Sequence, residues 1–278
     1  MNTAPGNTSV DKIPQPPPLP PPFKIQPTNY NLNYFNCEFC IMQRNDNITN
    51  AMWNSGHILL KYLEQSNNDY ITEITNVIAS KDTTSDMNKA LEKYSMSDTV
   101  ILELGAGVGH VGIAISLGLQ PKEYIFTDYQ TDEIRKNVIE NMVMCDDKFD
   151  GDQNKFTCGN TKVNIVNVDW KHSPEICYND SSVPDVLLCI DCVWIADLYI
   201  PLLNHILYLS VLNPNLIIIL AHEHRQQDSY KDFFKVLIDN NMIVRKIYDE
   251  DLVAKSPIVG LFLICKAKCD DDKTRLME

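Results

Sequence analysis

The sequence lacks two features that would place a protein in or across a membrane. No window of its 278 residues reaches the roughly 18 consecutive apolar residues that a membrane-spanning helix needs. Its first residues also lack the charged-then-apolar pattern of a secretory signal peptide. We therefore expect neither a membrane partner nor export.

Basic residues are scarce relative to acidic ones. The chain has 24 Lys and Arg against 37 Asp and Glu, a net charge of −13 and an isoelectric point of about 4.8. Nucleic-acid binding needs a basic face for phosphate contacts, so this balance argues against a nucleic-acid partner. The acidity suits a cationic target, such as a Lys-rich or Arg-rich protein segment, or serves solubility alone.

Hydrolase and metal-site signatures are missing as well. The sequence contains no Gly-x-Ser-x-Gly and no His-Glu-x-x-His motif. His222 and His224 would share one face of a strand, but no third metal ligand is evident. The CxxC pairs at 37–40 and 189–192 lack glycine-rich knuckles, and an offset of three on a strand sends the sulfurs to opposite faces. We expect no bound metal.

Disulfides are also unexpected. The nine cysteines are an odd number, and most of them lie in apolar runs. This usage fits reduced thiols in the cytoplasm, with the nucleus as a second compartment.

Three segments differ in composition from the rest of the chain. Residues 1–28 contain a polyproline-like run at 14–22, which cannot join a core and predicts a disordered tail. The run fits an SH3 or WW domain, although such runs act more often as spacers. Residues 65–98 are polar and predict an insertion in a single domain at 29–268, and residues 269–278 form a polar tail. We expect a monomer.

Short apolar runs alternate with longer, helix-compatible runs from residue 99 onward, which is typical of a parallel sheet. Strands are expected at 99–104, 123–127, 163–168, 184–190 and 215–221. Helices are expected at 109–118, 131–143, 197–210 and 227–240. The runs at 242–248 and 258–266 have no helix between them and predict an antiparallel hairpin at the sheet edge. Ahead of this region, 37–43 favours a strand and 53–63 a helix.

The most informative stretch is 100–112, where an apolar run ends in Glu103 and is followed by glycines at alternate positions. This order predicts a strand, a tight turn and a helix. Gly105, Gly107 and Gly109 lack a Cβ, so the turn can adopt positive φ and a ligand can lie against bare backbone. The helix that follows directs its free N–H groups and its positive dipole end at that ligand.

Two ligands that contain a ribose fit this turn, a dinucleotide and S-adenosylmethionine (SAM). Gly107, Gly109 and Gly112 satisfy the dinucleotide pattern GxGxxG, and Asp128 ends the next strand, where it would reach ribose hydroxyls in either case. Glu103 separates the two ligands, because its carboxylate would repel a pyrophosphate but suits the ammonium and sulfonium of SAM. We favour SAM, with S-adenosyl-L-homocysteine as the product. A turn without any ligand would leave two acidic strand ends unexplained.

Acidic residues follow or end four of the expected strands: Glu103, Asp128, Asp169 and Asp191. Open α/β sheets bind ligands beyond the carboxyl ends of their strands, and four like charges at that edge favour a bound cation. Taken singly, each is also compatible with a solvated strand end or a helix cap. Trp53 and Trp170 are candidates to flank an adenine or a sulfonium, and Trp194 to line a substrate channel, although each alone also suits a core.

With these residues gathered, the sequence resembles the class I, seven-stranded SAM-dependent methyltransferases, and within them the methyltransferase-like protein-lysine methyltransferases of family 16. The matching pieces are MWNSG at 52–56, the turn at 103–109, Thr127-Asp128, Asp169-Trp170, DCVW at 191–194 and EHR at 223–225. The resemblance implies an α/β fold: a Rossmann-like, seven-stranded, mostly parallel sheet with an antiparallel C-terminal hairpin and helices on both faces. Position 194 holds Trp where that branch usually has Tyr.

The resemblance also implies how the cofactor would be held. Glu103 and the glycines of the turn would cradle the methionine end of SAM, and Asp128 would bind its ribose. Asp169 and Trp170 would border the adenine, with Trp53 on the other side of the pocket.

For catalysis the resemblance implies Asp191, which would face the sulfonium or the incoming amine, and Trp194, which would line the entrance. The implied reaction is methyl transfer to a lysine of a non-histone protein, for example one of the translation apparatus. The chain has no Asn-Pro-Pro-Tyr run, the mark of relatives that methylate amide or adenine nitrogens. Two alternatives stay open: a small-molecule or RNA methyltransferase with 65–98 as a lid, and a catalytically silent SAM-binding scaffold.

Overall fold

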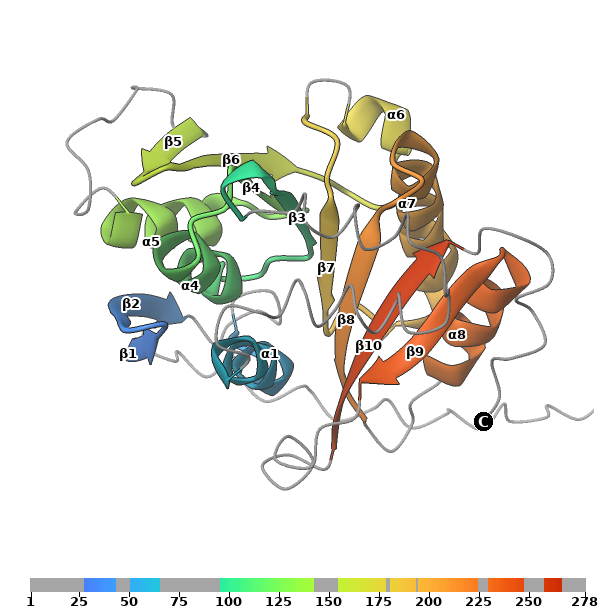
Figure 1. Ribbon diagram of the computed structural model, residues 1–278, viewed down its shortest axis with the longest axis horizontal. Helices are drawn as coiled ribbons and strands as arrows, with labels where there is room; N and C mark the ends of the chain where they lie inside the picture. The colour runs from blue at the N-terminus through green and yellow to red at the C-terminus, as the bar shows by residue number, and fades with distance from the viewer. Residues whose placement is uncertain are drawn as a thin grey trace, which may run out of the picture.

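The computed structural model describes residues 28–43, 51–65, 96–142, 155–178, 181–193, 195–224, 230–247 and 258–266. Five parallel strands form the centre of its large sheet: β3 (Val100–Leu104), β4 (Glu123–Asp128), β6 (Thr161–Asn167), β7 (Val186–Ile190) and β8 (Ile217–Glu223) (Figure 1). Beside β8 lies β10 (Val259–Lys266), which is antiparallel to it, and β9 (Met242–Ile247) follows at the edge. All strands and the hairpin expected from residue 99 onward are therefore confirmed, and so is the fold class.

One strand of the large sheet was not expected from the sequence. The strand β5 (Lys155–Cys158) pairs antiparallel with β6 and extends the sheet to eight strands, in the order β5-β6-β4-β3-β7-β8-β10-β9. Its four residues contain no apolar run that would predict a strand. Their pairing with β6 follows instead from the tight turn that joins the two strands. Gly159, with φ of 57°, supplies the left-handed residue that this tight turn requires.

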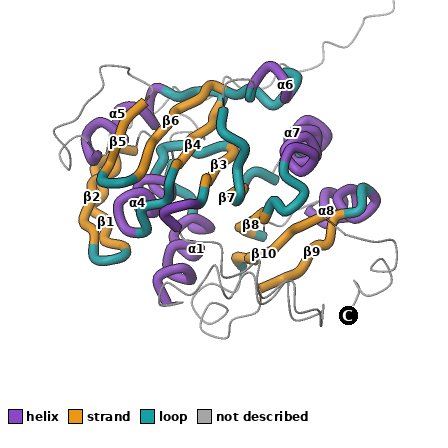
Figure 2. The backbone as a smooth tube through the Cα atoms, turned by 45° about the horizontal axis from the view of Figure 1, so that its top comes forward, coloured by secondary structure: helices purple, strands orange, loops and turns teal. Residues whose placement is uncertain are grey.

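Helices cover both faces of the sheet (Figures 1 and 2). On one face lie α1 (Asn54–Gln65), α4 (His110–Gly118) and α5 (Asp132–Met142). On the other lie α6 (Pro174–Cys177), α7 (Tyr199–Leu212) and α8 (Tyr230–Asp239). Two short 3₁₀ helices, η2 (Met96–Asp98) and η4 (Ala196–Leu198), precede β3 and α7.

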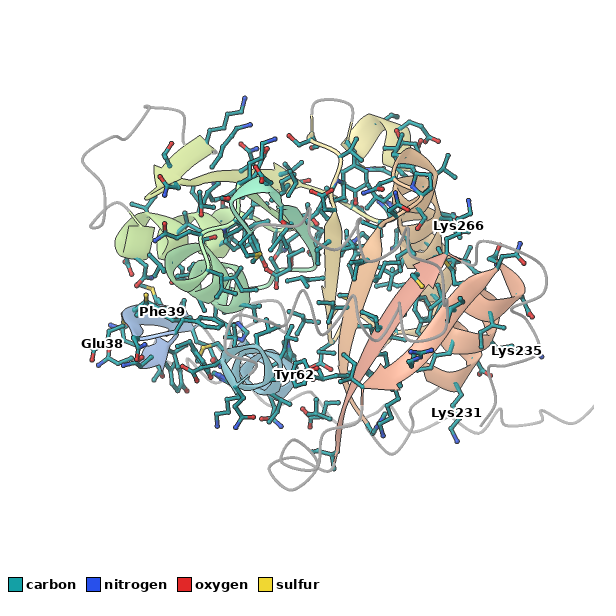
Figure 3. The ribbon with its side chains drawn as sticks, viewed as in Figure 1. Glu38, Phe39, Tyr62, Lys231, Lys235 and Lys266 are labelled. Atoms are coloured by element: carbon teal, nitrogen blue, oxygen red, sulfur yellow. The ribbon has the colours of Figure 1, made fainter. Side chains whose placement is uncertain are left out.

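The helices bury one face each, as their sequences dictate. In α8, Phe233 and Leu237 are fully buried against the sheet, whereas Lys231 and Lys235 are exposed at the periphery of the molecule (Figure 3). No helix among the described residues has the length and apolar character needed to cross a membrane.

A separate hairpin lies beside α4 and α5. It consists of β1 (Thr28–Tyr34) and β2 (Cys37–Gln43), paired antiparallel, and β2 packs against both helices. The strand at 37–43 and the helix that follows it were expected. The strand β1 begins at Thr28, the last residue of the expected tail at 1–28. The rest of that tail, the centre of the expected insertion at 65–98 and the tail at 269–278 lie outside the described residues.

Candidate functional site

The glycine turn joins β3 to α4 at the carboxyl edge of the sheet. Gly105, Gly107 and Gly109 have φ of 67°, 60° and 78°, the left-handed region that favours glycine. The Ala106 amide donates to the Thr127 carbonyl at 2.9 Å, and the Gly109 amide donates to the Ala106 carbonyl at 2.8 Å. Gly109 is also the N-cap of α4, and having no side chain it leaves the first amides of the helix without a side-chain cap.

The third glycine of the GxGxxG pattern, Gly112, does not lie in the turn and contributes to packing instead. Gly112 lies within α4, where an added Cβ would collide with the rings of Phe126 and Tyr124. It therefore allows α4 to pack closely on β4, which is a structural requirement and not a ligand contact.

Asp128 holds the turn against the end of β4. Its Oδ2 accepts the Gly107 amide at 2.9 Å, and its Oδ1 accepts the Gln130 amide at 3.0 Å. Burial raises the pKa of Asp128 above its ordinary value, while these two amide bonds counteract part of the rise. The carboxylate is thus a fixed, buried acceptor directly beside the glycine turn.

Glu103 is an acidic residue inside an otherwise apolar strand. It is 2% exposed, and its Oε2 accepts the hydroxyl of Tyr124 at 2.9 Å. Burial raises the pKa of Glu103 to about 8; the Tyr124 bond lowers it, and the nearby charge of Asp128 raises it further. A carboxyl group in such a position ionises readily only when a cation lies against it.

Asp191 follows β7 in a strained conformation. Its φ is 52°, which is uncommon for a residue with a side chain and is typical of functional sites. Its amide donates to the Ala221 carbonyl at 2.8 Å, and its Oδ1 accepts the Glu223 amide at 2.9 Å, so the residue ties the end of β7 to β8. The Nδ1 of His222 lies 3.7 Å from the same oxygen.

The left-handed turn at Asp191 overturns one expectation from the sequence. Cys189 and Cys192 were expected to point to opposite faces of a strand, but both lie in the same buried cluster, and contact with the Cys189 thiol is the main cause that raises the pKa of Cys192. The strand ends at Ile190, and the positive φ that follows turns the chain back. The expected opposite placement was therefore wrong.

Cys192 forms a wall of the glycine turn. Its thiol donates to the Leu104 carbonyl at 2.9 Å, and a Cβ added to Gly105 would lie 3.4 Å from its sulfur. The charges of Asp191 and Glu103 both raise its pKa, so both carboxylates lie close to it. Three of the four acidic residues, Glu103, Asp128 and Asp191, are thus buried around one turn.

The fourth acidic residue is placed differently. Asp169 is half-buried, and its Oδ1 accepts the Lys171 amide at 3.0 Å to close a local turn. It acts electrostatically on Cys177 and His205. Its neighbour Trp170 does reach the site, because a Cβ on Gly105 would lie 3.3 Å from the Trp170 ring.

Trp170 is held from behind by a buried histidine of α7. The Nε2 of His205 lies 3.2 Å from the Trp170 carbonyl, and its Nδ1 lies 3.0 Å from the hydroxyl of Tyr178. Burial lowers the pKa of His205 below its ordinary value, so the ring is neutral near pH 7. A neutral ring can donate from Nε2 to the carbonyl while Nδ1 accepts from Tyr178.

Replacing His205 with leucine should loosen Trp170. The change leaves the buried hydroxyl of Tyr178 without this partner, at a cost of about 1–3 kcal/mol, and the partly buried Trp170 carbonyl without it at a smaller cost. We expect a lower urea midpoint and a red-shifted tryptophan emission. A glutamine at 205 can still donate and accept, so it should retain most of both properties. If the leucine and glutamine variants behave alike, the hydrogen bonds of His205 do not position Trp170.

Fewer contacts are described for the other residues that were considered for the site, namely Trp53, Trp194, His222 and His224. Trp53 is half-buried and directly precedes α1, whose Gly56 approaches His110 at the start of α4 so closely that a Cβ would collide with it. Trp194 lies outside the described residues. His222 and His224 have their rings 5.8 Å apart, and among the described residues no group of three potential ligands forms a metal site.

Sequence reasoning missed three residues that shape the site: Tyr124, His205, and Asn137, whose Nδ2 donates to the Val108 carbonyl of the glycine turn at 2.9 Å. It named Cys192 within the DCVW match but gave it no role. The position of Tyr124 could have been inferred from the sequence. In the parallel pairing of β3 and β4, Tyr124 lies beside Ile101, which is two residues before Glu103 and therefore on the same face of the sheet. Asn137 and His205 act across long separations in sequence, and no local pattern points to them.

Comparison with known proteins is consistent with this geometry. Residues 39–240 match the family model described as lysine methyltransferase. No curated protein matches the chain significantly.

Several solved structures are similar to parts of this chain at low sequence identity. A ribosomal protein L11 methylase from Lactobacillus delbrueckii subsp. bulgaricus is 15% identical, with a TM-score of 0.40, over 72% of this chain and 81% of that one. A TehB-like SAM-dependent methyltransferase from Corynebacterium glutamicum is 14% identical, with a TM-score of 0.43, over 77% and 100%. A human methyltransferase 10 domain containing protein is 12% identical, with a TM-score of 0.41, over 72% and 81%.

Proposed function

Because the chain belongs to the lysine methyltransferase family, we propose that its glycine turn and buried carboxylates form the active site and that its substrate is a lysine of a non-histone protein. As a family member it is a SAM-dependent methyltransferase. The observation that carries the site assignment is the group of three buried carboxylates, Glu103, Asp128 and Asp191, around a turn of bare backbone.

The residues at the turn fit SAM on two observations. Glu103 is a buried carboxyl group with a pKa of about 8, which an ammonium or sulfonium would stabilise in its charged form. Gly105 has a φ of 67°, which strains any residue with a Cβ, and a Cβ there would also lie 3.3 Å from Trp170, so bare backbone is favoured where a ligand would lie. A dinucleotide fits less well, because its pyrophosphate would place a negative charge, and not a cation, beside Glu103.

We assign the cofactor contacts accordingly. Glu103 and the turn take the methionine end, and Asp128, already a fixed acceptor, takes the ribose hydroxyls. Trp170 and Asp169 border the adenine, and Trp53 closes the other side.

Methyl transfer requires a neutral amine aligned with the methyl group. When bound, SAM would supply a methyl group on a sulfonium, a group that a neutral amine can accept with S-adenosyl-L-homocysteine as the leaving group. Lysine has an ordinary pKa of about 10.4, so burial of its side chain must assist loss of the proton. Asp191 attracts the approaching ammonium and orients it. Trp194, which lines the entrance in this assignment, lies outside the described residues.

The choice of substrate class rests on charge and compartment. A net charge of −13 steers a Lys-rich protein toward the enzyme. The described cysteines are free thiols, which supports work in the reducing cytoplasm or nucleus. A translation-related protein is one such target. We further propose that the enzyme is a monomer and that its Pro-rich segment serves as a spacer or as an SH3 or WW ligand.

Label transfer tests this function. The purified protein is incubated with SAM that carries a tritiated methyl group and with a cell extract from which small molecules have been removed. We expect label in protein bands, and acid hydrolysis of those bands should release the label as methyl-lysine. Reductive dimethylation of the extract beforehand should abolish the label, because it blocks lysine amines. Label found only in RNA, or only in a small-molecule fraction when that fraction is restored, would replace this proposal. SAM binding without any transfer would favour a silent scaffold.

A further inference from the structure

The outer edge of β2 is closed by side chains instead of by another strand. The strand β1 pairs with one edge of β2. At the other edge, the Cys40 amide donates to Asn141 Oδ1 at 2.6 Å, and the Met42 amide donates to Asn137 Oδ1 at 3.0 Å. In return, Asn141 Nδ2 donates to the Cys40 carbonyl at 2.5 Å, and Asn137 Nδ2 donates to the Met42 carbonyl at 3.2 Å. Two asparagines of α5 thus stand in for a strand.

The match depends on two periodicities. Residues 40 and 42 are two apart on a strand, about 6.7 Å at 3.3–3.4 Å per residue. Residues 137 and 141 are four apart on a helix, about 6 Å at 1.5 Å per residue. An Asn-x-x-x-Asn helix face therefore presents amide groups in near register with every second residue of a strand.

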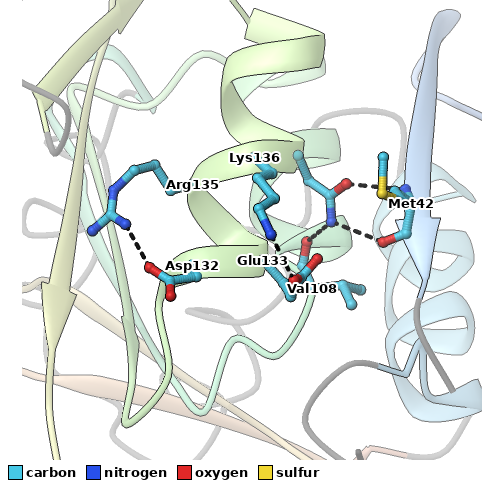
Figure 4. Close-up of polar contacts among 7 residues, drawn as sticks. Met42, Val108, Asp132, Glu133, Arg135 and Lys136 are labelled. Atoms are coloured by element: carbon cyan, nitrogen blue, oxygen red, sulfur yellow. Dashed lines mark hydrogen bonds and ion pairs between the residues drawn. The ribbon is translucent and has the colours of Figure 1, made fainter. Parts of the chain in front are cut away.

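Asn137 makes one contact that Asn141 does not. Its Nδ2 also donates, at 2.9 Å, to the carbonyl of Val108, the residue between Gly107 and Gly109 in the cofactor turn (Figure 4). Asn137 is fully buried, and both hydrogens of its amide nitrogen are used. The second hydrogen bond from Asn141 Nδ2 goes to the carbonyl of Asn137, within α5, and not to the turn.

The contact with Val108 fixes a peptide group that glycine would otherwise leave free. The carbonyl of the Val108–Gly109 peptide accepts from Asn137, and its amide end donates to the Ala106 carbonyl. Gly109, on one side of this plane, offers little steric resistance to its rotation, so without the Asn137 bond only the Gly109–Ala106 bond would hold the plane. Rotation would redirect the backbone against which the cofactor lies.

We propose that Asn137 is a positioning residue that couples docking of β2 to the shape of the cofactor turn. The inference rests on the proposed binding of SAM at that turn. It makes the coupling reciprocal: SAM, by holding the turn, stabilises the edge of β2, and a docked β2 favours SAM. Asn137 touches neither the cofactor nor the substrate in this scheme and acts through Val108.

A matched pair of variants separates this coupling from general stability. Asn137→Asp and Asn141→Asp each keep the acceptor for β2 and each lose two donated bonds, but only the first loses a bond to the turn. We expect both to lower the unfolding temperature by similar amounts. Asn137→Asp should weaken SAM binding by calorimetry about tenfold or more, raise KM for SAM and leave kcat at saturating SAM within twofold. Asn141→Asp should change SAM affinity less than twofold.

Hydrogen exchange of the unmodified chain gives a second test that survives if Asn137→Asp does not fold. Saturating SAM should slow exchange of the Met42 amide at least threefold. An unchanged Met42 amide, or equal SAM affinities for the two aspartate variants, would overturn the coupling. If the unmodified chain does not bind SAM at all, the cofactor assignment fails first, and that result is distinguishable from either of these.

Discussion

Replacing Glu103 with glutamine is expected to weaken SAM binding about 10- to 100-fold at pH 8.5. The ionised carboxylate contributes a charge-assisted contact worth about 1.5–3 kcal/mol, which a neutral amide cannot supply. The glutamine can still accept the Tyr124 hydroxyl bond, so the fold around β3 should persist. Calorimetric titration at several pH values measures the loss.

The pH dependence should be as diagnostic as the affinity. Since the pKa of Glu103 rises from 4.5 to about 8 in the cofactor-free chain, its contribution to stability is present below pH 4.5 and is lost as pH rises through 8. A bound cation favours the ionised form, so SAM binding at pH 6.5 should release close to one proton, and at pH 9.5 almost none. The affinity for SAM should therefore rise between pH 6.5 and 8. In the glutamine variant both effects should vanish.

The control is a glutamate at the amino ends of the parallel strands, opposite the carboxyl ends where the glycine turn lies. Glu123 begins β4, is 4% exposed, and accepts bonds from Lys162 and Ser182. Glu123→Gln should leave proton release on SAM binding unchanged. Proton release that persists in Glu103→Gln would show that another group meets the cation.

The second large effect concerns turnover. Asp191→Asn should lower kcat about a hundredfold while SAM affinity stays within about threefold. Asparagine tolerates the left-handed conformation at φ of 52° and can accept the Glu223 amide, so the substitution removes charge and little else. Alanine would lose the bond and strain the turn, so it is a poorer probe. Single-turnover assays with a lysine substrate, paired with SAM titration, separate chemistry from binding.

Asp185 provides the matched control for this variant. It lies just before β7, as Asp191 lies just after it, and its Oδ2 accepts the Val100 amide at 2.9 Å. Asp185→Asn keeps that geometry at the opposite edge of the sheet and should leave kcat unchanged. Full activity in Asp191→Asn would reduce Asp191 to a structural tie between β7 and β8.

Local sequence accounts for much of this site. The apolar run into Glu103, the alternate glycines and the apolar helix predicted the strand, the turn and α4, and the structure has them at 100–118. Each of these signals depends on neighbours within a few residues, because strand alternation, helix periodicity and positive φ are local properties. The edge strand β5 escaped because its pairing follows from a turn and not from apolar content.

Within the site, the sequence by itself determined which backbone would be bare and which strand ends would be acidic. Only the tertiary structure decided which of those acids are buried together and what holds them: Asn137 reaches Met42 across 95 positions, and His205 reaches Trp170 across 35. Contacts of that range depend on strand register and on the rotation of each helix against the sheet, which packing of the whole core fixes. Strand alternation had placed Cys189 and Cys192 apart, and the left-handed conformation of Asp191 between them, which the tie to β8 holds, brings them together.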